Sequence, residues 1–309
     1  MFNRREFTKM LVAGLPAISM AGWAIDSKFR GVDLGAQTYS FRALPPTPGS
    51  SDKVDVDVRA LQECGIGEIE LFSPDIEPRS ATSGRGARGG ANNPEAKEAR
   101  EKLRRWRLST PVEHFQAVRR QFNDAGIRIF AYTINYREDF TDEEVDKTFE
   151  QAHGLGVGII ATSTQVSMAR RLVPFAARHK MTVAFHGHDR TDDPNEFSTP
   201  ESFQKALDLS PDFKVNLDIG HFTAAGYDPV EYIQQHHARI THLHVKDRKK
   251  NHGPNVPWGE GDTPIREVLL LVKQKQYPIP AFVEYEYQGA GTPVEETRKC
   301  FEYMKKVLA

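Results

Sequence analysis

Eight short apolar segments alternate with helical segments along this chain, and this alternation constrains the fold more than any other feature. Several of these segments are continuously apolar, as parallel strands buried on both faces are expected to be. Strands are predicted at residues 33–40, 67–72, 127–131, 157–161, 181–186, 213–218, 240–245 and 279–286. Apolar spacing predicts helices at residues 54–64, 112–125, 142–155, 166–179, 202–209, 229–236, 264–275 and 294–307.

Eight strand–helix units in a chain of 309 residues predict one α/β domain, a single (β/α)8 TIM barrel that spans residues 25–309. A doubly wound open sheet is the alternative architecture. No GxGxxG motif follows the first predicted strand, which argues against the dinucleotide-binding version of that sheet.

Ligand-type side chains gather at the ends of the predicted strands. In the segment 240–247, which reads ITHLHVKD, His242 and His244 lie two residues apart and therefore face the same side of a strand. Alone, this segment fits a core strand with hydrogen-bonded histidines equally well. Other strands end in the same way, and the carboxyl ends of barrel strands converge on one mouth. The residues at these ends are Glu70, His186, His188, Asp218, His221, His244, Lys246, Glu284 and Glu286.

Two imidazoles and two carboxylates that meet at one mouth suit one divalent metal ion, such as Mn²⁺, Co²⁺, Zn²⁺ or Mg²⁺. Water or substrate would complete the coordination. The predicted metal ligands are His186, Asp218, His244 and Glu284.

Three motifs resemble the sugar phosphate isomerase/epimerase family, whose members are xylose isomerase-like barrels. They are Asp218-Ile-Gly-His221, His242-Leu-His-Val-Lys-Asp247 and Val283-Glu-Tyr-Glu-Tyr287. The resemblance covers the chain beyond its first residues. It implies metal binding by Asp218, His244 and Glu284, and substrate contacts from His221 and Lys246. Glu286 lies on the same strand face as Glu284 and is a second candidate for its role.

The fifth strand departs from the family pattern, because family epimerases place a glutamate there that serves as ligand and base. The matching residue here is His186. The HVKD segment, the Pro257-Trp258-Gly259 segment and EYEY resemble exported members that act on 3-keto-glycosides. That resemblance implies a 3-keto-glycoside lyase or keto-glucal hydratase that works through an enediolate.

In this interpretation Glu284 takes a proton, while His188, Lys246 or His221 acts as the acid. Substrate contacts are expected from Glu70, Arg190, Glu286 and Trp258. A sugar isomerase or epimerase is the alternative, followed by a non-catalytic carbohydrate-binding barrel and a phosphodiesterase-type endonuclease. A net charge of -1 argues against nucleic acid as a partner, which leaves a small carbohydrate.

The first 24 residues have the pattern of an export signal rather than of a folded element. Arg4 and Arg5 precede an apolar run, 10–20, and then small residues suited to cleavage. The adjacent arginines resemble a twin-arginine signal and predict a periplasmic protein without a stable membrane anchor. An ordinary secretory signal or a disordered basic tail would also fit.

A long Gly- and Arg-rich loop is predicted at about 74–110. Its centre, residues 80–93, has low complexity and is predicted to be mobile near the barrel mouth. Cys64 and Cys300 fall on the first and last predicted helices at different heights, so both thiols are predicted to be buried and unpaired. Homo-oligomerisation is left open.

Overall fold

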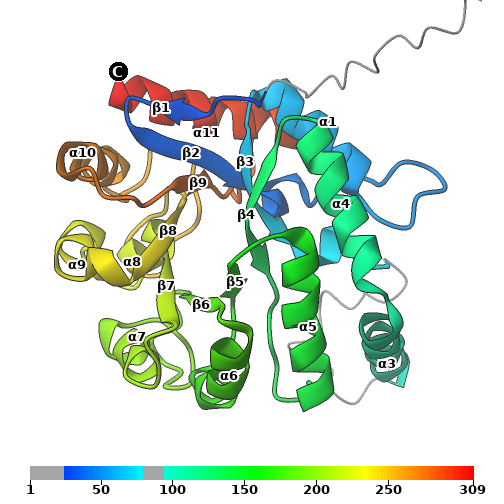
Figure 1. Ribbon diagram of the computed structural model, residues 1–309. Coiled ribbons are helices and arrows are strands. Elements are labelled where there is room, and N and C mark those ends of the chain that lie inside the picture. The colour runs from blue at the N-terminus through cyan, green and yellow to red at the C-terminus, as the bar shows by residue number, and fades with distance from the viewer. Residues whose placement is uncertain (1–23, 79–93) are drawn as a thin grey trace, which may run out of the picture.

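Eight parallel strands close into a barrel, and a short strand, β1 (Lys28–Phe29), adds antiparallel to the first of them (Figure 1). The computed structural model describes residues 24–78 and 94–309. Neighbouring strands pair in chain order, and β2 also pairs with β9, which closes the barrel. The barrel strands are β2 (Val32–Gln37), β3 (Glu68–Phe72), β4 (Arg128–Thr133), β5 (Ile159–Thr162), β6 (Thr182–His186), β7 (Phe213–Asp218), β8 (Ile240–Val245) and β9 (Ala281–Val283).

Helices surround the barrel and join each strand to the next, as in a (β/α)8 fold (Figure 1). The predicted fold class is therefore confirmed. The helices that connect or close these units are α1 (Val54–Cys64), α4 (Val112–Asp124), α5 (Asp142–Leu155), α6 (Val166–His179), α7 (Pro200–Leu207), α9 (Pro229–His236), α10 (Ile265–Lys275) and α11 (Pro293–Leu308).

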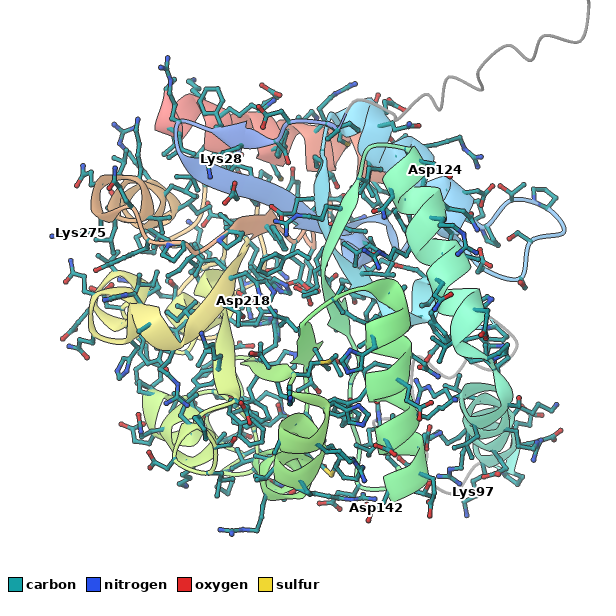
Figure 2. The ribbon with its side chains drawn as sticks, viewed as in Figure 1. Lys28, Lys97, Asp124, Asp142, Asp218 and Lys275 are labelled. Atoms are coloured by element: carbon teal, nitrogen blue, oxygen red, sulfur yellow. The ribbon has the colours of Figure 1, made fainter. Side chains whose placement is uncertain are left out.

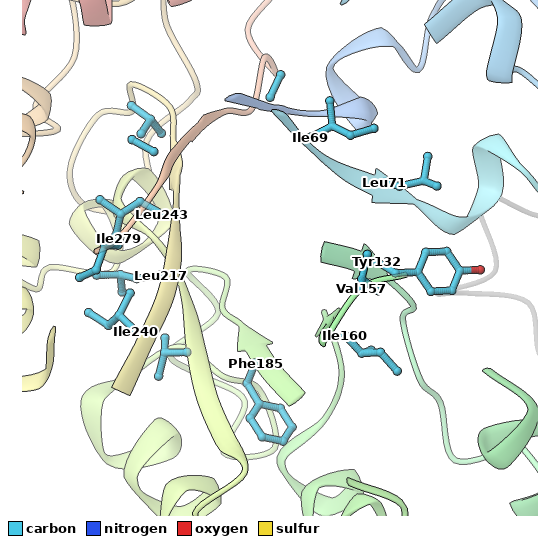
Figure 3. Close-up of a cluster of buried hydrophobic side chains, with 14 of the residues drawn as sticks. Ile69, Leu71, Tyr132, Val157, Ile160, Phe185, Leu217, Ile240, Leu243 and Ile279 are labelled. Carbon is cyan, nitrogen blue, oxygen red and sulfur yellow. The ribbon is translucent and has the colours of Figure 1, made fainter. Parts of the chain in front are cut away.

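Near their carboxyl ends, β7 and β8 carry apolar residues on the outer face and polar residues on the inner face. Outward side chains such as Leu217 and Leu243 are fully or almost fully buried against the helices (Figure 3). The next residues in the strands, Asp218 and His244, point into the barrel. Figure 2 shows Asp218 inside the ring of strands, whereas Lys275 lies at the outer end of a helix. The helices thus supply the apolar core, and the lumen is free to carry polar groups.

Aromatic rings occupy the lower part of the lumen. Phe130 and Phe282 make an edge contact with ring centroids 5.4 Å apart, and His242 lies 5.4 Å from each. Gly35 of β2 provides the space, because a Cβ atom there would lie 2.6 Å from the Phe282 ring. The polar residues at the strand ends therefore lie above the rings of Phe130 and Phe282, which we call the aromatic floor.

The predicted loop at 74–110 is wrong in its second half, since α3 (Pro94–Ser109) is helical. Its sequence PEAKEAREKLRRWRLS is rich in strong helix formers and begins with proline at the first helical position. The apolar pattern missed it because Leu103 and Arg107 are its buried residues. The prediction of a mobile segment at 80–93 lies outside the described residues.

Other differences are small. The first predicted strand ends early in the 3-10 helix η1 (Thr38–Phe41), and the last predicted strand is shortened to β9. Four further elements were not predicted: β1, η2 (Ser73–Asp75), η3 (His237–Arg239) and α8 (Ile219–Ala224). The short helix α8 matters for function, because it begins directly after Asp218.

Both cysteines are buried and free, as predicted. The Cys64 thiol donates to the Val294 carbonyl oxygen on the neighbouring helix α11. Burial raises the pKa of both thiols to about 12. Within the described ranges, no helix combines the length and apolar character that crossing a membrane requires.

Candidate metal centre

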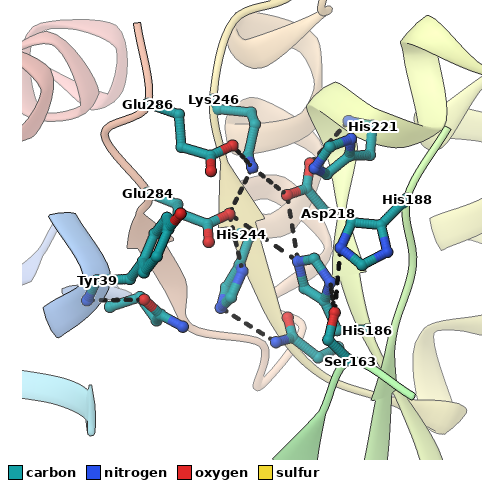
Figure 4. Close-up of polar contacts among 12 residues, drawn as sticks. Tyr39, Ser163, His186, His188, Asp218, His221, His244, Lys246, Glu284 and Glu286 are labelled. Carbon is teal, nitrogen blue, oxygen red and sulfur yellow. Dashed lines mark hydrogen bonds and ion pairs between the residues drawn. The ribbon is translucent and has the colours of Figure 1, made fainter. Parts of the chain in front are cut away.

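Four buried side chains converge where strands β6 to β9 end (Figure 4). They are His186, Asp218, His244 and Glu284, the predicted metal ligands, and one ligand atom from each lies within 4.8 Å of the others. His186 Nε2 is 3.4 Å from Asp218 Oδ2, and His244 Nδ1 is 3.2 Å from Glu284 Oε2. The barrel register therefore brings together residues that are far apart in the chain.

In each of these four residues the atom that faces the group has no hydrogen-bond partner. These atoms are His186 Nε2, Asp218 Oδ2, His244 Nδ1 and Glu284 Oε2. Buried polar atoms are normally hydrogen-bonded, so four at one point that lack a hydrogen bond need a common explanation. Two nitrogen and two oxygen donors fit a divalent cation such as Zn²⁺ or Mn²⁺.

The other polar atoms of these ligands are held by neighbours. Asp218 is the N-cap of α8, and its Oδ1 accepts a hydrogen bond of 2.7 Å from the His221 backbone N–H. His186 Nδ1 lies 3.5 Å from the Ser163 hydroxyl. His244 Nε2 contacts Glu70. Asp218, His186 and His244 are thus each oriented by a contact at one atom, while a second atom faces the centre of the group.

Lys246 connects the carboxylates on one side of the site. Its ammonium lies 3.0 Å from Asp218 Oδ2 and 2.6 Å from Glu284 Oε2, as ion pairs rather than well-directed hydrogen bonds. It also donates to Glu286 Oε2 at 2.5 Å. Gly220 leaves room for the aliphatic part of the Lys246 side chain, because a Cβ atom at this position would lie 2.3 Å from Lys246 Cγ. This contact explains the glycine of the Asp218–His221 motif.

The opposite side of the site is lined by histidine (Figure 4). His188 Nε2 is 3.1 Å from the Ser163 hydroxyl, and His188 Nδ1 is 3.3 Å from Glu196 Oε2. Arg190 donates to the other oxygen of Glu196 at 3.1 Å. Arg190 was expected to contact substrate, but its guanidinium is engaged with acidic neighbours.

His221 belongs to a second polar cluster beside His188. Its Nδ1 lies 3.3 Å from Asp189 Oδ1 and 2.5 Å from an Arg248 nitrogen. Arg248 also forms an ion pair with Asp189 at 2.9 Å. Burial and the nearby Lys246 ammonium lower the pKa of His221 to about 4, so its imidazole is neutral near pH 7.

Electrostatics within the metal-ligand group favour ionised carboxylates. Burial opposes ionisation, yet Lys246 and His244 hold the pKa of Glu284 well below its usual range. Lys246 and His221 lower the pKa of Asp218 in the same way. Burial also opposes protonation of His244, but the carboxylates of Glu70 and Glu284 raise its pKa to about 10. The ion-free centre is therefore a network of compensated charges.

Glu70 was expected to contact substrate, and its position contradicts this. It is 0% exposed, and both its oxygens are hydrogen-bonded inside the barrel. Trp258 packs edge-on against Tyr303 of α11 and lines a hollow of about 370 Å³ that also includes Tyr287. Neither residue belongs to the group of four.

Sequence reasoning missed several residues that support the site. Ser163, Asp189, Glu196, Asn216 and Arg248 all contact a predicted site residue. Asn216 and Asp218 share one face of β7 because they lie two residues apart, which was a usable signal. The other four lie in loops after strands, where spacing does not indicate direction.

The chain is similar to known proteins in sequence and in fold. The family model described as xylose isomerase-like TIM barrel matches residues 58–307. L-ribulose-5-phosphate 3-epimerase UlaE from Salmonella paratyphi A is 29% identical over 142 residues, which cover 44% of this chain and 48% of that protein. The chain thus aligns with about half the length of this curated relative.

Solved structures share the whole barrel. The probable 3-DHS dehydratase AsbF from Bacillus anthracis superposes with a TM-score of 0.58 at 19% identity, covering 89% of this chain and 98% of that one. The IolI protein with a bound zinc atom gives a TM-score of 0.59 at 15% identity, covering 89% and 96%. Such low identities establish the fold alone. The family match over most of its length shows that the chain belongs to the xylose isomerase-like TIM barrel family.

Proposed function

We propose that this protein is a divalent-metal-dependent enzyme that removes a proton beside the carbonyl group of a keto-sugar or keto-glycoside. The observation that carries the proposal is the convergence from four strand ends of four buried ligand atoms that lack a hydrogen-bond partner. The relatives with named activities are an epimerase and a probable dehydratase, which supports an enzyme that acts on sugars. A divalent cation supplies Lewis acidity at a carbonyl oxygen, which acidifies the neighbouring C–H bond.

We assign the removal of the proton to the two carboxylates on one side of the site, Glu284 and Glu286. Glu284 and Glu286 share the ammonium of Lys246 and come from the same edge of the barrel. Glu284 belongs to the metal-ligand group, whereas the Glu286 side chain is more exposed, 19% against 7%. The pair therefore offers one carboxylate to hold the ion and a second one nearer the mouth.

The histidine side is assigned the proton delivery. In an elimination, the C–H proton goes to the carboxylate pair and the C–O bond to the leaving group breaks. The freed electron pair forms a C=C bond conjugated with the carbonyl. His188, held between Ser163 and Glu196, gives its proton to the departing oxygen. Hydration of a keto-glucal is the reverse of this sequence.

His186 favours elimination or hydration over epimerisation. Epimerisation removes a proton on one face and delivers one on the other, which usually needs two positioned bases. The imidazole of His186 directs its unpartnered Nε2 into the metal-ligand group, so that lone pair is committed to the ion. A 3-keto-glycoside lyase or keto-glucal hydratase is therefore the preferred activity.

A sugar isomerase or epimerase is the second candidate, and the match to an L-ribulose-5-phosphate 3-epimerase favours it. His188 is the group that would act as the second base in that case, because it faces the carboxylate pair across the site (Figure 4).

Incubation of the metal-loaded protein in D₂O separates the two candidates. A 3-keto-glucoside should give an enone and a released aglycone if the protein eliminates. A plain ketose should then be recovered without inversion at the neighbouring carbon. Recovery of the ketose as its C-epimer with one solvent deuterium, together with an intact glycoside, would establish the epimerase instead.

A further inference from the structure

The imidazole of His244 lies between two carboxylates, one above it and one below. Its Nδ1 faces Glu284 at 3.2 Å and has no hydrogen-bond partner. Its Nε2 contacts Glu70 Oε2 on the opposite side of the ring. The ring is 1% exposed, so its two nitrogens meet different, fixed surroundings.

Glu70 is held in place by contacts from three other strands. Its Oε1 accepts from the Thr133 hydroxyl of β4, and its Oε2 lies 2.6 Å from His242 Nε2 of β8. The Asn216 amide of β7 lies 3.4 Å from the same oxygen. A carboxylate with no exposed surface and this many partners cannot turn toward a substrate. It forms a polar layer between the aromatic floor and the metal-ligand group.

An ionised carboxylate only accepts hydrogen bonds, so each imidazole that approaches Glu70 must bring an N–H group. Both oxygens of Glu70 face donors, the Thr133 hydroxyl at Oε1 and the Asn216 amide at Oε2, so Glu70 acts as a hydrogen-bond acceptor on both sides. Nε2 of His244 is therefore the nitrogen that brings a hydrogen to Glu70, and Nδ1 is the nitrogen that faces the metal-ligand group.

We propose that Glu70 is a positioning residue that fixes the tautomer and orientation of His244, so that Nδ1 binds the metal ion. The inference rests on the metal-dependent function proposed above and deepens it. A carboxylate behind a ligating imidazole also makes that ligand more basic and strengthens metal binding. Glu70 thus acts through His244.

The cluster of Glu70, His242 and His244 has the composition of a second metal site. Its hydrogen bonds argue against that role. The Nε2 atoms of both imidazoles lie within hydrogen-bond distance of Glu70 Oε2, whereas the four ligand atoms of the upper group lack a hydrogen-bond partner. Hydrogens on the imidazole nitrogens are enough to compensate the Glu70 carboxylate in this cluster. We therefore expect one metal ion per chain, bound by the group of His186, Asp218, His244 and Glu284.

Metal affinity in a graded series of variants tests the proposal. Glu70→Gln keeps an acceptor oxygen but removes the charge, and Glu70→Ala removes both. The dissociation constant for Zn²⁺, measured by competition with a chelator, should rise by about 10- to 100-fold, more for alanine than for glutamine. Glu144→Gln is the matched control, because it neutralises another carboxylate whose side chain is 0% exposed, in a cluster on α3 and α5.

The outcomes separate this inference from the proposed function. Wild-type protein that binds no Zn²⁺ would overturn the metal-dependent function itself. Tight binding by the wild type with equally tight binding by both Glu70 variants would overturn only the role of Glu70. Two zinc equivalents in the wild type, with one lost in Glu70→Ala, would make the lower cluster a metal site instead.

A measurement on the wild type avoids variants that fail to fold. In the zinc-loaded protein, long-range ¹H–¹⁵N NMR of the histidine rings reports which nitrogen carries hydrogen. His244 should show a protonated Nε2 and a metal-bound Nδ1. A metal-bound Nε2 with a protonated Nδ1 would refute the inference, whatever the affinities of the variants.

Discussion

At the residue scale, the metal-ligand group depends on side chains that are anchored at one atom and free at another. Asp218 shows this most clearly, because Oδ1 caps α8 while Oδ2 faces the three other ligands. His244 divides its two nitrogens in the same way between Glu70 and Glu284. Such anchoring keeps four donors close together before any ion arrives, which lowers the ordering cost of metal binding.

Replacing Asp218 with Asn, or His244 with Ala, should remove the metal ion without unfolding the barrel. Each change deletes one of four ligands, while the apolar core outside the strands is untouched. Metal content, measured by elemental analysis of the purified protein, should fall from one equivalent to a small fraction. Far-UV circular dichroism should stay close to that of the wild type.

Asp212→Asn is the matched control for Asp218→Asn. It makes the same chemical change just before β7 begins, at the end of the strand away from the site. Its metal content should equal that of the wild type. Full occupancy in both Asp218→Asn and His244→Ala would disprove the assigned ligands.

At the element scale, α3 shows how a polar helix can be held on the barrel by charge. Three of its four arginines, Arg100, Arg104 and Arg107, reach one carboxylate, Glu144, in the first turn of α5. Arg107 also pairs with Glu77 at 2.7 Å. Three cations around one buried carboxylate compensate its desolvation, so this helix docks with few apolar contacts.

Glu144→Gln should destabilise the protein at neutral pH by roughly 3–5 kcal/mol, since it removes the carboxylate that three arginines share, one of which, Arg107, is buried. Burial opposes ionisation, but the arginines lower the pKa of Glu144 in the folded state. A lowered folded-state pKa gives stability that is complete above the unfolded pKa, about 4.3, and is lost as the pH falls further. The difference from wild type in urea unfolding should therefore be constant from pH 7 to 5 and shrink below pH 4.

Glu143→Gln, on the same turn but exposed, serves as the control and should change the free energy of unfolding very little. A pH-independent difference between Glu144→Gln and wild type would contradict the ion-pair account of α3.

The closing helix α11 begins with a capping box whose contribution is measurable. The Thr292 hydroxyl accepts from the Glu295 N–H at 3.3 Å, and the Glu295 carboxylate accepts from the Thr292 N–H at 2.7 Å. Thr292→Ala should cost about 1 kcal/mol of stability in denaturant unfolding, because it leaves a helix N–H group unsatisfied. Thr292→Ser keeps the hydroxyl and should restore nearly all of it; an equal loss in both variants would point to packing rather than capping.

At the scale of the whole molecule, closure of the barrel creates the site. Pairing of β2 with β9 completes the ring, and the consecutive pairings of β6 to β9 place the ligands side by side. An open sheet would spread the same strand ends along a line. The family match and the shared fold of AsbF and IolI agree with this closed arrangement.

We also propose that the protein is exported through the twin-arginine route, on the strength of Arg4, Arg5 and the apolar run that follows. Replacing both arginines with lysine in a Gram-negative host should abolish export while keeping the charge of the segment. Fractionation should then find the protein in the cytoplasm instead of the periplasm. Lys9→Arg is the control and should be exported normally; undiminished export of the double variant would favour an ordinary secretory signal.

Much of the fold followed from local patterns. The boundaries of β7, β8, α1, α5 and α6 match those predicted, because continuous apolar runs and helical apolar spacing reflect burial directly. The helix α3 was missed because ion pairs, rather than apolar side chains, hold much of it against the barrel. Patterns of hydrophobicity detect only the elements that hydrophobicity holds in place.

By itself, the sequence determined that His242 and His244 share one face of a strand, and that ligand-type residues end several strands. The family resemblance selected His244 as the metal ligand, but strand alternation alone did not distinguish it from His242 and did not show what Glu70 contacts, since both depend on height within the barrel. Tertiary structure placed His244 level with Asp218 and left His242 on the aromatic floor below. The physical reason is that strand alternation is local, whereas the stagger of eight strands around a closed barrel exists only once the ring has formed.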